Sequence, residues 1–467
     1  MNGKHISKLG LNPKAAALAL NVARRQEDLG TSRRDILDAL SQVKADPEAY
    51  LESDYAELAR ELLAQTCSQV QRQAGSALRP APLPYAEFGS ALIEPGARSQ
   101  MDVAMRLPVA RAGALMPDAH VGYGLPIGGV LAAENAVIPY GVGVDIGCSM
   151  QLSVFGTRPE QLPTAEALSL LRRHTRFGAG VGFERRERLD HPVLDDPAWS
   201  EQPLLRHLHD KAAEQIGTSG SGNHFVEFGT FTLQAPEEGL ETGTYLALLS
   251  HSGSRGFGAQ VAGHFTKLAE QRHAALDPAA RKLAWLPLDS DEGAAYWQAM
   301  TLAGHYALAN HQQIHARISR ALNEAPLLSV RNSHNLAWKE PLEDSELIVH
   351  RKGATPAAAG QLGLIPGSMA DPAYLVRGRG YAPALASASH GAGRQLGRNA
   401  ARAALSKTEV ADYLAQRGVT LLGGGIDEAP QAYKRIEDVM AAQSDLVDVL
   451  GEFMPKVVRM DSGGQDI

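Results

Sequence analysis

The chain has 467 residues, of which 44% are hydrophobic and 21% charged, and its formal net charge is −7. This composition excludes a disordered chain and a generally basic nucleic-acid coat protein, and two cysteines are too few for a disulfide framework. Because we find no apolar run of about 18 residues and no signal-peptide pattern, we expect a cytoplasmic protein in a reducing compartment, without a membrane span. Glycine is the one excess: its 46 residues make up about a tenth of the chain, against a usual share of about 7%.

Residues 1–80 predict a small helical extension. Residues 13–25, 32–43 and 53–73 are rich in Ala, Leu, Arg and Glu, with apolar residues at helical spacing. Ser32 stands three residues before Asp35, which is typical of a helix N-cap. The segment carries 11 basic and 10 acidic residues, and this near balance argues against a basic arm for nucleic acid. The proline-rich residues 78–85 predict a linker.

Residues 86–467 predict one large domain of mixed α/β (α+β) class. Short β-like runs occur at residues 130–138, 150–155, 225–228, 245–249, 327–330, 347–350 and 420–422. Helical patterns occupy residues 164–175, 304–324, 394–406 and 436–449. The strands are spaced irregularly and no internal repeat occurs, so the pattern does not predict a doubly wound parallel sheet.

Many glycines fall in six clusters that also hold residues able to do chemistry. The clusters lie at residues 116–129, 141–148, 217–227, 251–258, 365–369 and 390–394. Glycine permits positive φ angles and a close approach of the backbone to a ligand, and exposed backbone N–H groups bind anions. One such turn is a weak indication. Six of them, each with a His, Asp, Cys, Arg or Ser, predict a functional site.

Residues of the metal-ligand type lie at several predicted strand ends. Taken singly, each is more often a turn residue or a small buried residue than a ligand. Together they form a plausible two-metal set, because a cysteine thiolate can bridge two cations, and the donor types suit Zn, Mn, Fe or Co without choosing among them. The set is Asp145, Cys148, His224, His251 and His334, with His120 as a weaker candidate.

Basic residues concentrate near the end of the chain. Residues 350–407 hold eight basic residues and one acidic residue, so this segment carries +7 while the rest of the chain carries −14. Guanidinium groups suit phosphate contacts, although we expect Arg398 and Arg402 to be solvated helix surface. Within this segment His390 lies on a turn that leads into a predicted helix. It is either a nucleophile for a nucleotide phosphate or a simple N-capping histidine.

These motifs resemble the RtcB-type RNA ligases, which join RNA 3′-phosphate or 2′,3′-cyclic phosphate ends to 5′-hydroxyl ends. The resemblance runs from about residue 93 to about residue 458 through ordered blocks that include MPDAHVGYGLPIGG, GVGVDIGC, GSGNHFVE, HSGSRGFG, SHNLAWKE, IPGSM, HGAGR and EAPQAYKRIEDV. It implies an α/β fold of its own kind, which is neither a Rossmann fold nor that of classical nucleotidyltransferases.

The resemblance also implies roles for individual residues. Cys148 would bridge two Mn²⁺ ions, with His224 and His251 completing one site and Asp145 and His334 completing the other. His390 would take GMP from GTP. The guanylate pocket would be lined by Asn223, Phe225, Glu227, Asn335, Pro366, Gly367, Ser368, Met369, Gly391, Ala392 and Gly393. Candidates for holding RNA phosphates are Arg255, Arg351, Lys352 and Arg394, and an archease-like protein is a candidate activating partner.

Several positions depart from the family pattern. Met460 stands where similar proteins usually carry a lysine that contacts guanine, Ala373 where Ser is common, and Gly147 where Asn is common. These departures leave ATP open as an alternative nucleotide and suggest a divergent paralogue that repairs cleaved RNA rather than splicing tRNA. Two other functions remain open: an enzyme that only caps or processes 3′-phosphate ends, and a non-catalytic protein that binds RNA or a nucleotide.

Overall fold

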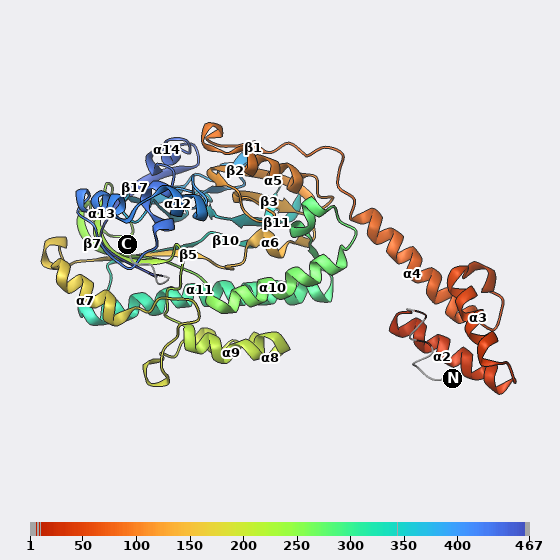
Figure 1. The fold of residues 1–467 in the computed structure, drawn as a ribbon. Helices are drawn as coiled ribbons and strands as arrows, with labels where there is room; N and C mark the ends of the chain where they lie inside the picture. Colours follow the sequence, from red (N-terminus) through yellow and green to blue (C-terminus); the bar gives the residue numbers. More distant parts are fainter. Residues whose placement is uncertain (1–5, 7–8, 10, 343, 463–467) are drawn as a thin grey trace. The chain divides into compact units, whose positions relative to one another are not determined.

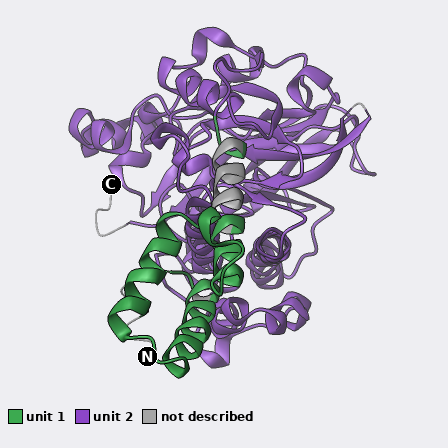
Figure 2. Cartoon of the chain, turned by 90° about the vertical axis from the view of Figure 1, so that its right-hand side faces the viewer, with its two compact units in different colours: residues 1–77 green, residues 78–467 purple. Residues whose placement is uncertain are grey.

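The computed structural model describes residues 6, 9, 11–342 and 344–462 (Figure 1). It divides into two compact units, residues 1–77 and residues 78–467 (Figure 2). Each unit has a hydrophobic core of its own, so we describe the two separately.

Between residues 11 and 77, the first unit contains the α-helices α2 (Pro13–Asp28), α3 (Arg33–Ala45) and α4 (Ala56–Gly75), which overlap the three predicted helical stretches. The Ser32 hydroxyl accepts a hydrogen bond from the backbone N–H of Asp35, which confirms the predicted N-cap. Buried residues spaced three or four apart, including Ile36 and Leu40, pack with Leu58 of α4. Residues 78–85, the predicted linker, form neither helix nor strand.

The second unit is built around two main sheets. A five-stranded sheet has the order β1 (Ala86–Glu87), β2 (Ala110–His120), β3 (Ile127–Ala133), β11 (Ser345–Lys352) and β10 (Asn335–Leu342). An eight-stranded sheet has the order β13 (Leu362–Pro366), β14 (Ala373–Gly378), β17 (Val447–Met460), β6 (Phe225–Leu233), β7 (Gly243–Ser252), β5 (Ser149–Phe155) and β9 (Leu328–Ser333), with β16 (Thr420–Leu422) beside β17. Short pairs join β12 (Ala354–Pro356) to β15 (Ser387–Ser389) and β4 (Ala136–Val137) to β8 (Leu286–Pro287).

The helices of this unit are α5 (Pro95–Met105), α6 (Pro139–Val142), α7 (Thr164–His174), α8 (Ala198–Glu201), α9 (Pro203–Gln215), α10 (Arg255–Arg272), α11 (Asp291–Leu322), α12 (Arg398–Ala404), α13 (Lys407–Gln416) and α14 (Ile436–Ala441). Helices α7 and α11 pack on one face of the eight-stranded sheet through a core that includes Leu171, Phe228, Leu248 and Ile314 (Figure 1). The predicted mixed α/β class is confirmed. Among the described residues, no helix is both long and apolar enough to cross a membrane.

Two predictions about the last third of the chain are wrong. The helix predicted at residues 436–449 ends at Ala441, and Val447 begins β17, which pairs with both β14 and β6. In the strand, Val447 is 4% exposed and pairs with Gly378 of β14, and these sheet contacts override the helical pattern of the segment. The helix predicted from residue 394 begins only at Arg398, so His390 is not at a helix N-terminus. Gly393 has φ +71°, and a Cβ there would lie 2.2 Å from the carbonyl oxygen of Asp118.

Candidate metal and nucleotide site

Four neighbouring strands of the eight-stranded sheet bring the predicted metal ligands together. Cys148 directly precedes β5, His224 directly precedes β6, His251 lies near the end of β7, and His334 directly follows β9. Because β6, β7, β5 and β9 are adjacent and antiparallel, the starts of β5 and β6 meet the ends of β7 and β9 at one edge. The sheet register therefore gathers side chains that are far apart in the sequence.

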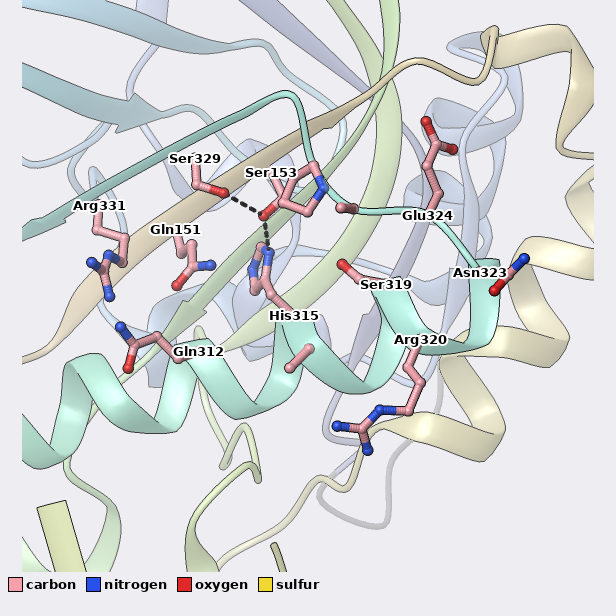
Figure 3. Close-up of a pocket in the computed structure, with 13 residues that line it drawn as sticks. Gln151, Ser153, Gln312, His315, Ser319, Arg320, Asn323, Glu324, Ser329 and Arg331 are labelled. Atoms are coloured by element: carbon pink, nitrogen blue, oxygen red, sulfur yellow. Dashed lines mark hydrogen bonds between the residues drawn. The ribbon is translucent and has the colours of Figure 1, made fainter. Parts of the chain in front are cut away.

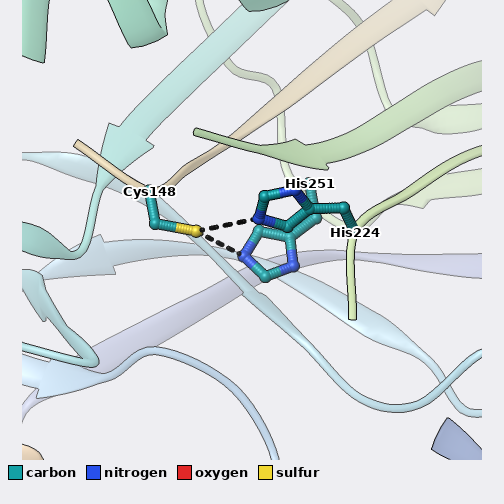
Figure 4. Close-up of side chains that lie close together, drawn as sticks. All are labelled: Cys148, His224 and His251. Atoms are coloured by element: carbon teal, nitrogen blue, oxygen red, sulfur yellow. Dashed lines mark hydrogen bonds between the residues drawn. The ribbon is translucent and has the colours of Figure 1, made fainter. Parts of the chain in front are cut away.

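The side chains of Cys148, His224 and His251 form a compact buried cluster (Figure 4). Cys148 Sγ lies 3.1 Å from Nε2 of His251 and 3.6 Å from Nε2 of His224. Asp145 and His334 extend the cluster on either side. An oxygen of Asp145 lies 3.1 Å from Nε2 of His224, and Nε2 of His334 lies 3.3 Å from Nε2 of His251.

The imidazole rings are oriented as metal-ligating histidines usually are. Nδ1 of His224 donates to the carbonyl oxygen of Ser219 over 2.8 Å, and Nδ1 of His251 donates to that of Asn223 over 3.1 Å. A neutral ring that donates from Nδ1 presents a lone pair at Nε2, and second-shell bonds of this kind fix the tautomer of metal-bound histidine. His224 therefore presents a lone pair to a carboxylate oxygen 3.1 Å away, which requires a proton or a cation between the two atoms.

Burial dominates the electrostatics of this cluster. It raises the pKa of the Cys148 thiol and lowers the pKa values of His251 and His334, all well beyond their usual ranges. All three groups are therefore held in their neutral forms in the absence of a cation. The set of thiol, imidazole and carboxylate donors fits a transition metal, which would deprotonate a coordinating thiol.

The contacts divide the ligands differently from the sequence expectation. That expectation joined His224 with His251, and Asp145 with His334. Instead, the shortest contacts place Asp145 on His224 and His334 on His251, while Cys148 contacts both histidines of the compact cluster. The geometry favours one cation between Asp145, Cys148 and His224 and a second between Cys148, His251 and His334.

Glycine makes room for these ligands at one decisive point. A Cβ at Gly253 would lie 2.3 Å from both carboxylate oxygens of Asp145, so only glycine allows the carboxylate to lie against the backbone there. The carboxylate instead accepts a hydrogen bond of 3.1 Å from the backbone N–H of Ser254.

His390 lies beside this cluster and is held by Asp118. One oxygen of Asp118 accepts from Nδ1 of His390 over 2.6 Å and from the backbone N–H of His390 over 3.0 Å. The bond to Nδ1 leaves Nε2 without its proton, as a nucleophile requires. The ring of His390 lies 5.2 Å from that of His334, measured between centroids.

Asp118, which the sequence pattern does not single out, is completely buried at the end of β2. Burial alone would raise the pKa of Asp118, but His390 and Lys434 hold it below its usual value, so this carboxylate stays charged. The only sequence signal for Asp118 is its place in the block MPDAH, in which the residue types favour His120 as a candidate metal ligand instead. His120 is also buried; its Nδ1 bonds to the carbonyl oxygen of Asp118 at 3.0 Å, and burial lowers its pKa to about 4.

One cavity of about 860 Å³ contains most of the predicted nucleotide site. His251 and His390 both line it, so the cluster and the candidate nucleophile open into the same space. The other predicted residues that line it are Asn223, Phe225, Pro366, Gly367, Ser368, Met369, Gly391, Ala392, Gly393 and Arg394. Glu227 and Asn335 are not among the lining residues.

Glu227 and Asn335 make other contacts instead. Glu227 is buried on β6, and burial raises the pKa of its carboxyl group well above the usual value. Asn335 donates to the carbonyl oxygen of Asp145 over 3.3 Å and accepts from the backbone N–H of Gly353 over 2.7 Å. It therefore braces the turn that carries a metal ligand.

Two of the four candidates for RNA phosphate contact are occupied inside the protein. Arg351 is 1% exposed and forms a two-pronged ion pair with Glu340. Lys352 is buried, donates to the carbonyl oxygens of Tyr123 and Leu125, and has its pKa lowered to about 7 by burial. Both lie on β11, which is paired on both sides, and neither side chain is free for a phosphate.

The other two candidates lie at the site. Arg255 donates to the Thr218 hydroxyl and the Gly178 carbonyl, and its charge lowers the pKa of Asp145, although burial and His224 act more strongly on that carboxyl. Arg394 lines the cavity and is paired with Glu428 at 3.0 Å.

The expectation that Arg398 and Arg402 are solvated helix surface is only half right. Both are about half exposed, yet both line the cavity, and both pair with the buried carboxylate of Asp427.

The three residues that depart from the family pattern lie in or near the site. Met460 lies in the cavity wall and pairs in register with Phe225, and Ala373 pairs with Pro366 of the IPGSM block. Gly147 has φ +74°, and a Cβ there would lie 2.9 Å from Cα of Gly304 in α11. This left-handed conformation is one that glycine and asparagine adopt most readily.

Comparison with known proteins places the chain in one family. A family model described as "tRNA-splicing ligase RtcB" matches residues 100–203 and 197–461. The RNA-splicing ligase RtcB of Escherichia coli (strain K12) is 33% identical over 386 residues, which cover 77% of this chain and 92% of that protein. The RNA-splicing ligase RtcB of Mycobacterium tuberculosis is 34% identical, with 76% and 98% covered, and the tRNA-splicing ligase RtcB of Nanoarchaeum equitans is 31% identical, with 76% and 90% covered. All the site residues described above, from Asp118 to Met460, fall within the matched ranges.

Proposed function

The chain belongs to the RtcB family, and from this premise we propose that it is a GTP- and Mn²⁺-dependent RNA ligase that joins 3′-phosphate or 2′,3′-cyclic phosphate ends to 5′-hydroxyl ends. One observation carries the proposal: His390, with Nε2 left free by Asp118, opens into the same cavity as the Cys148 cluster. The family assignment supports an RNA ligase, and the donor types of the cluster are compatible with Mn²⁺.

Two Mn²⁺ ions would be held by the grouping that the contacts favour, Asp145–Cys148–His224 and Cys148–His251–His334. When bound, such ions neutralise phosphate charge and polarise the phosphorus–oxygen bonds. The chain's own residues supply orientation. The carbonyl oxygens of Ser219 and Asn223 fix the two histidine rings, and Asn335 braces the Asp145 turn.

His390 would act as the nucleophile. Its Nε2 lone pair attacks the α-phosphorus of GTP, an N–P bond forms, and the bond to the β-phosphate oxygen breaks so that pyrophosphate leaves. Asp118 keeps the proton on Nδ1 and stabilises the positive charge that the ring acquires, which makes it a positioning residue.

The remaining steps transfer GMP to the RNA. Water first opens any cyclic phosphate by attacking its phosphorus, which breaks the bond to the 2′-oxygen and leaves a 2′-hydroxyl and a 3′-phosphate. An oxygen of this 3′-phosphate then attacks the GMP phosphorus, the N–P bond breaks, and its electron pair returns to Nε2. The 5′-hydroxyl loses its proton to solvent and attacks the activated 3′-phosphorus, which breaks the bond to GMP, releases GMP and seals the strand. Arg255 and Arg394 are our candidates for holding the RNA phosphates, because both lie at the site. Cytoplasmic location and an archease-like activator stay predictions.

Incubation with labelled GTP and Mn²⁺, followed by denaturing gel separation, tests the proposal. We expect a covalent adduct on the wild-type protein and on the control variant His207→Ala, which changes an exposed histidine of α9. His390→Ala should carry no adduct. Absence of adduct with GTP, ATP and several metals would leave the non-catalytic binding protein as the better interpretation. Sealing of a nicked RNA with 3′-phosphate and 5′-hydroxyl ends then separates a ligase from an enzyme that only caps.

A further inference from the structure

A second polar groove lies on the same sheet, between strands β5 and β9 and helix α11 (Figure 3). It encloses about 670 Å³, a size typical of small-ligand sites. Strand rise places Gln151 roughly 10 Å and Ser153 roughly 17 Å along β5 from Cys148. The groove is lined by a different set of residues from the cavity that holds His390.

The floor of this groove is polar where a buried strand face is normally apolar. On one face of β5, Met150, Leu152 and Val154 enter the hydrophobic core. On the other face, Gln151 and Ser153 are almost completely buried against α11. Burying polar groups costs free energy unless they are hydrogen-bonded, so this face needs an explanation.

Most of the floor is satisfied by a directed chain of hydrogen bonds. The chain ends at the carbonyl oxygen of Ser252, which can only accept, and this fixes the direction of every proton. His311 donates from Nε2 to that carbonyl, and the chain then runs back through Ser250, His315 and Ser153, with links of 2.6, 2.8 and 2.8 Å. Ser329 gives its proton to Ser153 over 3.3 Å, so at the mouth of the groove its oxygen offers only lone pairs.

A second part of the groove is not satisfied. Gln151 is 5% exposed, and its Oε1 has no hydrogen-bond partner among the described residues. Arg331 lies directly opposite Gln151 in the β5–β9 register, and its exposed side chain forms no ion pair or hydrogen bond with another described residue. Gln312 accepts from His191 through Oε1 over 2.8 Å, which leaves its NH₂ group for another partner. Figure 3 shows these three side chains pointing toward one another.

No free carboxylate competes for these donors. Glu324 is the acidic residue that lines the groove, and its oxygens accept from the backbone N–H groups of Gly156 and Thr157 and from the Thr157 hydroxyl. The lining residues therefore offer guanidinium and amide donors from Arg331 and Gln312 and acceptor oxygens from Ser329 and Gln151. A ligand that fits must carry an anionic acceptor and also hydroxyl or amino donors. A ribonucleotide has both, in its phosphate and its 2′-hydroxyl or base.

We propose that this groove is a second nucleotide-binding site, in which Arg331 and Gln312 hold a phosphate and Ser329 accepts from a ribose hydroxyl or base. The inference rests on the proposed function, because an RNA ligase must hold its substrate strand beyond the reacting ends. The shared chemistry also suits a free ribonucleotide, and the experiment separates the two sources.

The test measures binding in the unreactive His390→Ala protein, so that it does not depend on ligation. The probes are a fluorescent RNA 12-mer with a 5′-phosphate and a 3′-hydroxyl, followed by anisotropy, and AMP, followed by calorimetry. Arg331→Glu should weaken RNA binding about tenfold and reduce the slope of log affinity against log salt by about 1. The control Arg281→Glu changes an exposed arginine outside the groove and should leave both quantities unchanged.

Each outcome decides the proposal. If Arg331→Glu weakens the binding of RNA but not of AMP, the groove binds the phosphate of a polynucleotide. If the variant also weakens the binding of AMP, the groove binds a free nucleotide as well. If Arg331→Glu behaves like Arg281→Glu with both probes, the groove is not a nucleotide site. Gln151→Met checks the same conclusion in a variant that removes the unpartnered oxygen: it should weaken binding while the unfolding temperature stays equal or rises. If the GTP adduct is absent but Arg331→Glu still weakens RNA binding, the proposed ligase function is wrong, while the assignment of the groove as a nucleotide-binding site is supported.

Discussion

Two groups of buried histidines lie on the same sheet and differ in how their nitrogens are used. In the cluster around Cys148, the Nε2 atoms of His224 and His251 present lone pairs to the thiol and to the carboxylate of Asp145. In the hydrogen-bond chain between α11 and the sheet, His311 and His315 of α11 alternate with serine hydroxyls of the sheet, so that each donor faces an acceptor. The second group is complete by itself, whereas the first requires a cation or a proton. Donor and acceptor order, rather than histidine content, separates a candidate metal site from a structural network.

The largest expected effect comes from removing the Cys148 thiol, which both proposed metal sites share. Cys148→Ala should remove both metal ions and abolish the GTP adduct, because the thiol contacts the histidines of both proposed sites. Elemental analysis of protein loaded with Mn²⁺ measures the loss against wild type. Retention of two ions per chain would contradict the bridging role.

His390 combines features of the two groups, because one nitrogen is bonded and the other is free. Asp118→Asn should slow adduct formation by at least about 10²-fold, since an amide can donate to Nδ1 and shift the ring proton to Nε2. The rate of adduct formation with labelled GTP measures this, and bound metal should stay unchanged. A parallel loss of metal would show that Asp118 supports the fold rather than the tautomer.

Breaking the hydrogen-bond chain through His311 and His315 should lower the stability of the fold and leave the metal content unchanged. Ser250→Ala removes the donor to Nδ1 of His311 and the acceptor for Nε2 of His315, which leaves two buried polar groups unpaired. We expect a loss of about 2 kcal/mol in the free energy of unfolding by urea. The matched variant Ser200→Ala, which changes an exposed hydroxyl of α8, should lose much less. If Ser250→Ala releases metal while stability holds, the chain belongs functionally to the cluster.

The smallest effect concerns the cavity wall, which belongs to neither histidine group. Met460→Lys restores the ammonium donor that similar proteins usually carry, and should raise the preference of adduct formation for GTP over ATP about fivefold, which is ~1 kcal/mol. Competition between labelled GTP and unlabelled ATP measures the preference. An unchanged ratio would mean that residue 460 does not contact the base.

The sequence locates four of the candidate metal ligands because each one stands at the start or end of a strand. Cys148 and His224 come directly before β5 and β6, His251 lies near the end of β7, and His334 directly follows β9. The sheet register brings these side chains together, while their role as metal ligands stays a prediction. How the ligands divide between two ions depends on distances across strands, which no local pattern encodes.

Predictions failed where a long-range pairing decides the environment. Asp118 was missed because a carboxylate at the end of a buried strand has no local signature until His390 arrives from another part of the chain. Charge alone predicts that Arg351 and Lys352 bind phosphate. In the fold, Glu340 and Ser387 hold the Arg351 guanidinium, and the carbonyl oxygens of Tyr123 and Leu125 hold the Lys352 ammonium. The helix predicted at residues 436–449 ends at Ala441. The chain forms a strand from Val447 onward because this segment pairs with β14 on one side and with β6 on the other.

The placement of the ligands on four strands has a consequence for how the protein matures. His334 follows His251 by 83 residues, so a growing chain that has made β5, β6 and β7 still lacks the last ligand and strand β9. Under the proposed function, tight metal loading would have to wait until the sheet is assembled, and a bound ion would then stabilise only molecules that have completed it. Metal occupancy would thus report correct assembly, because chains that misplace any of the four strands would stay unloaded.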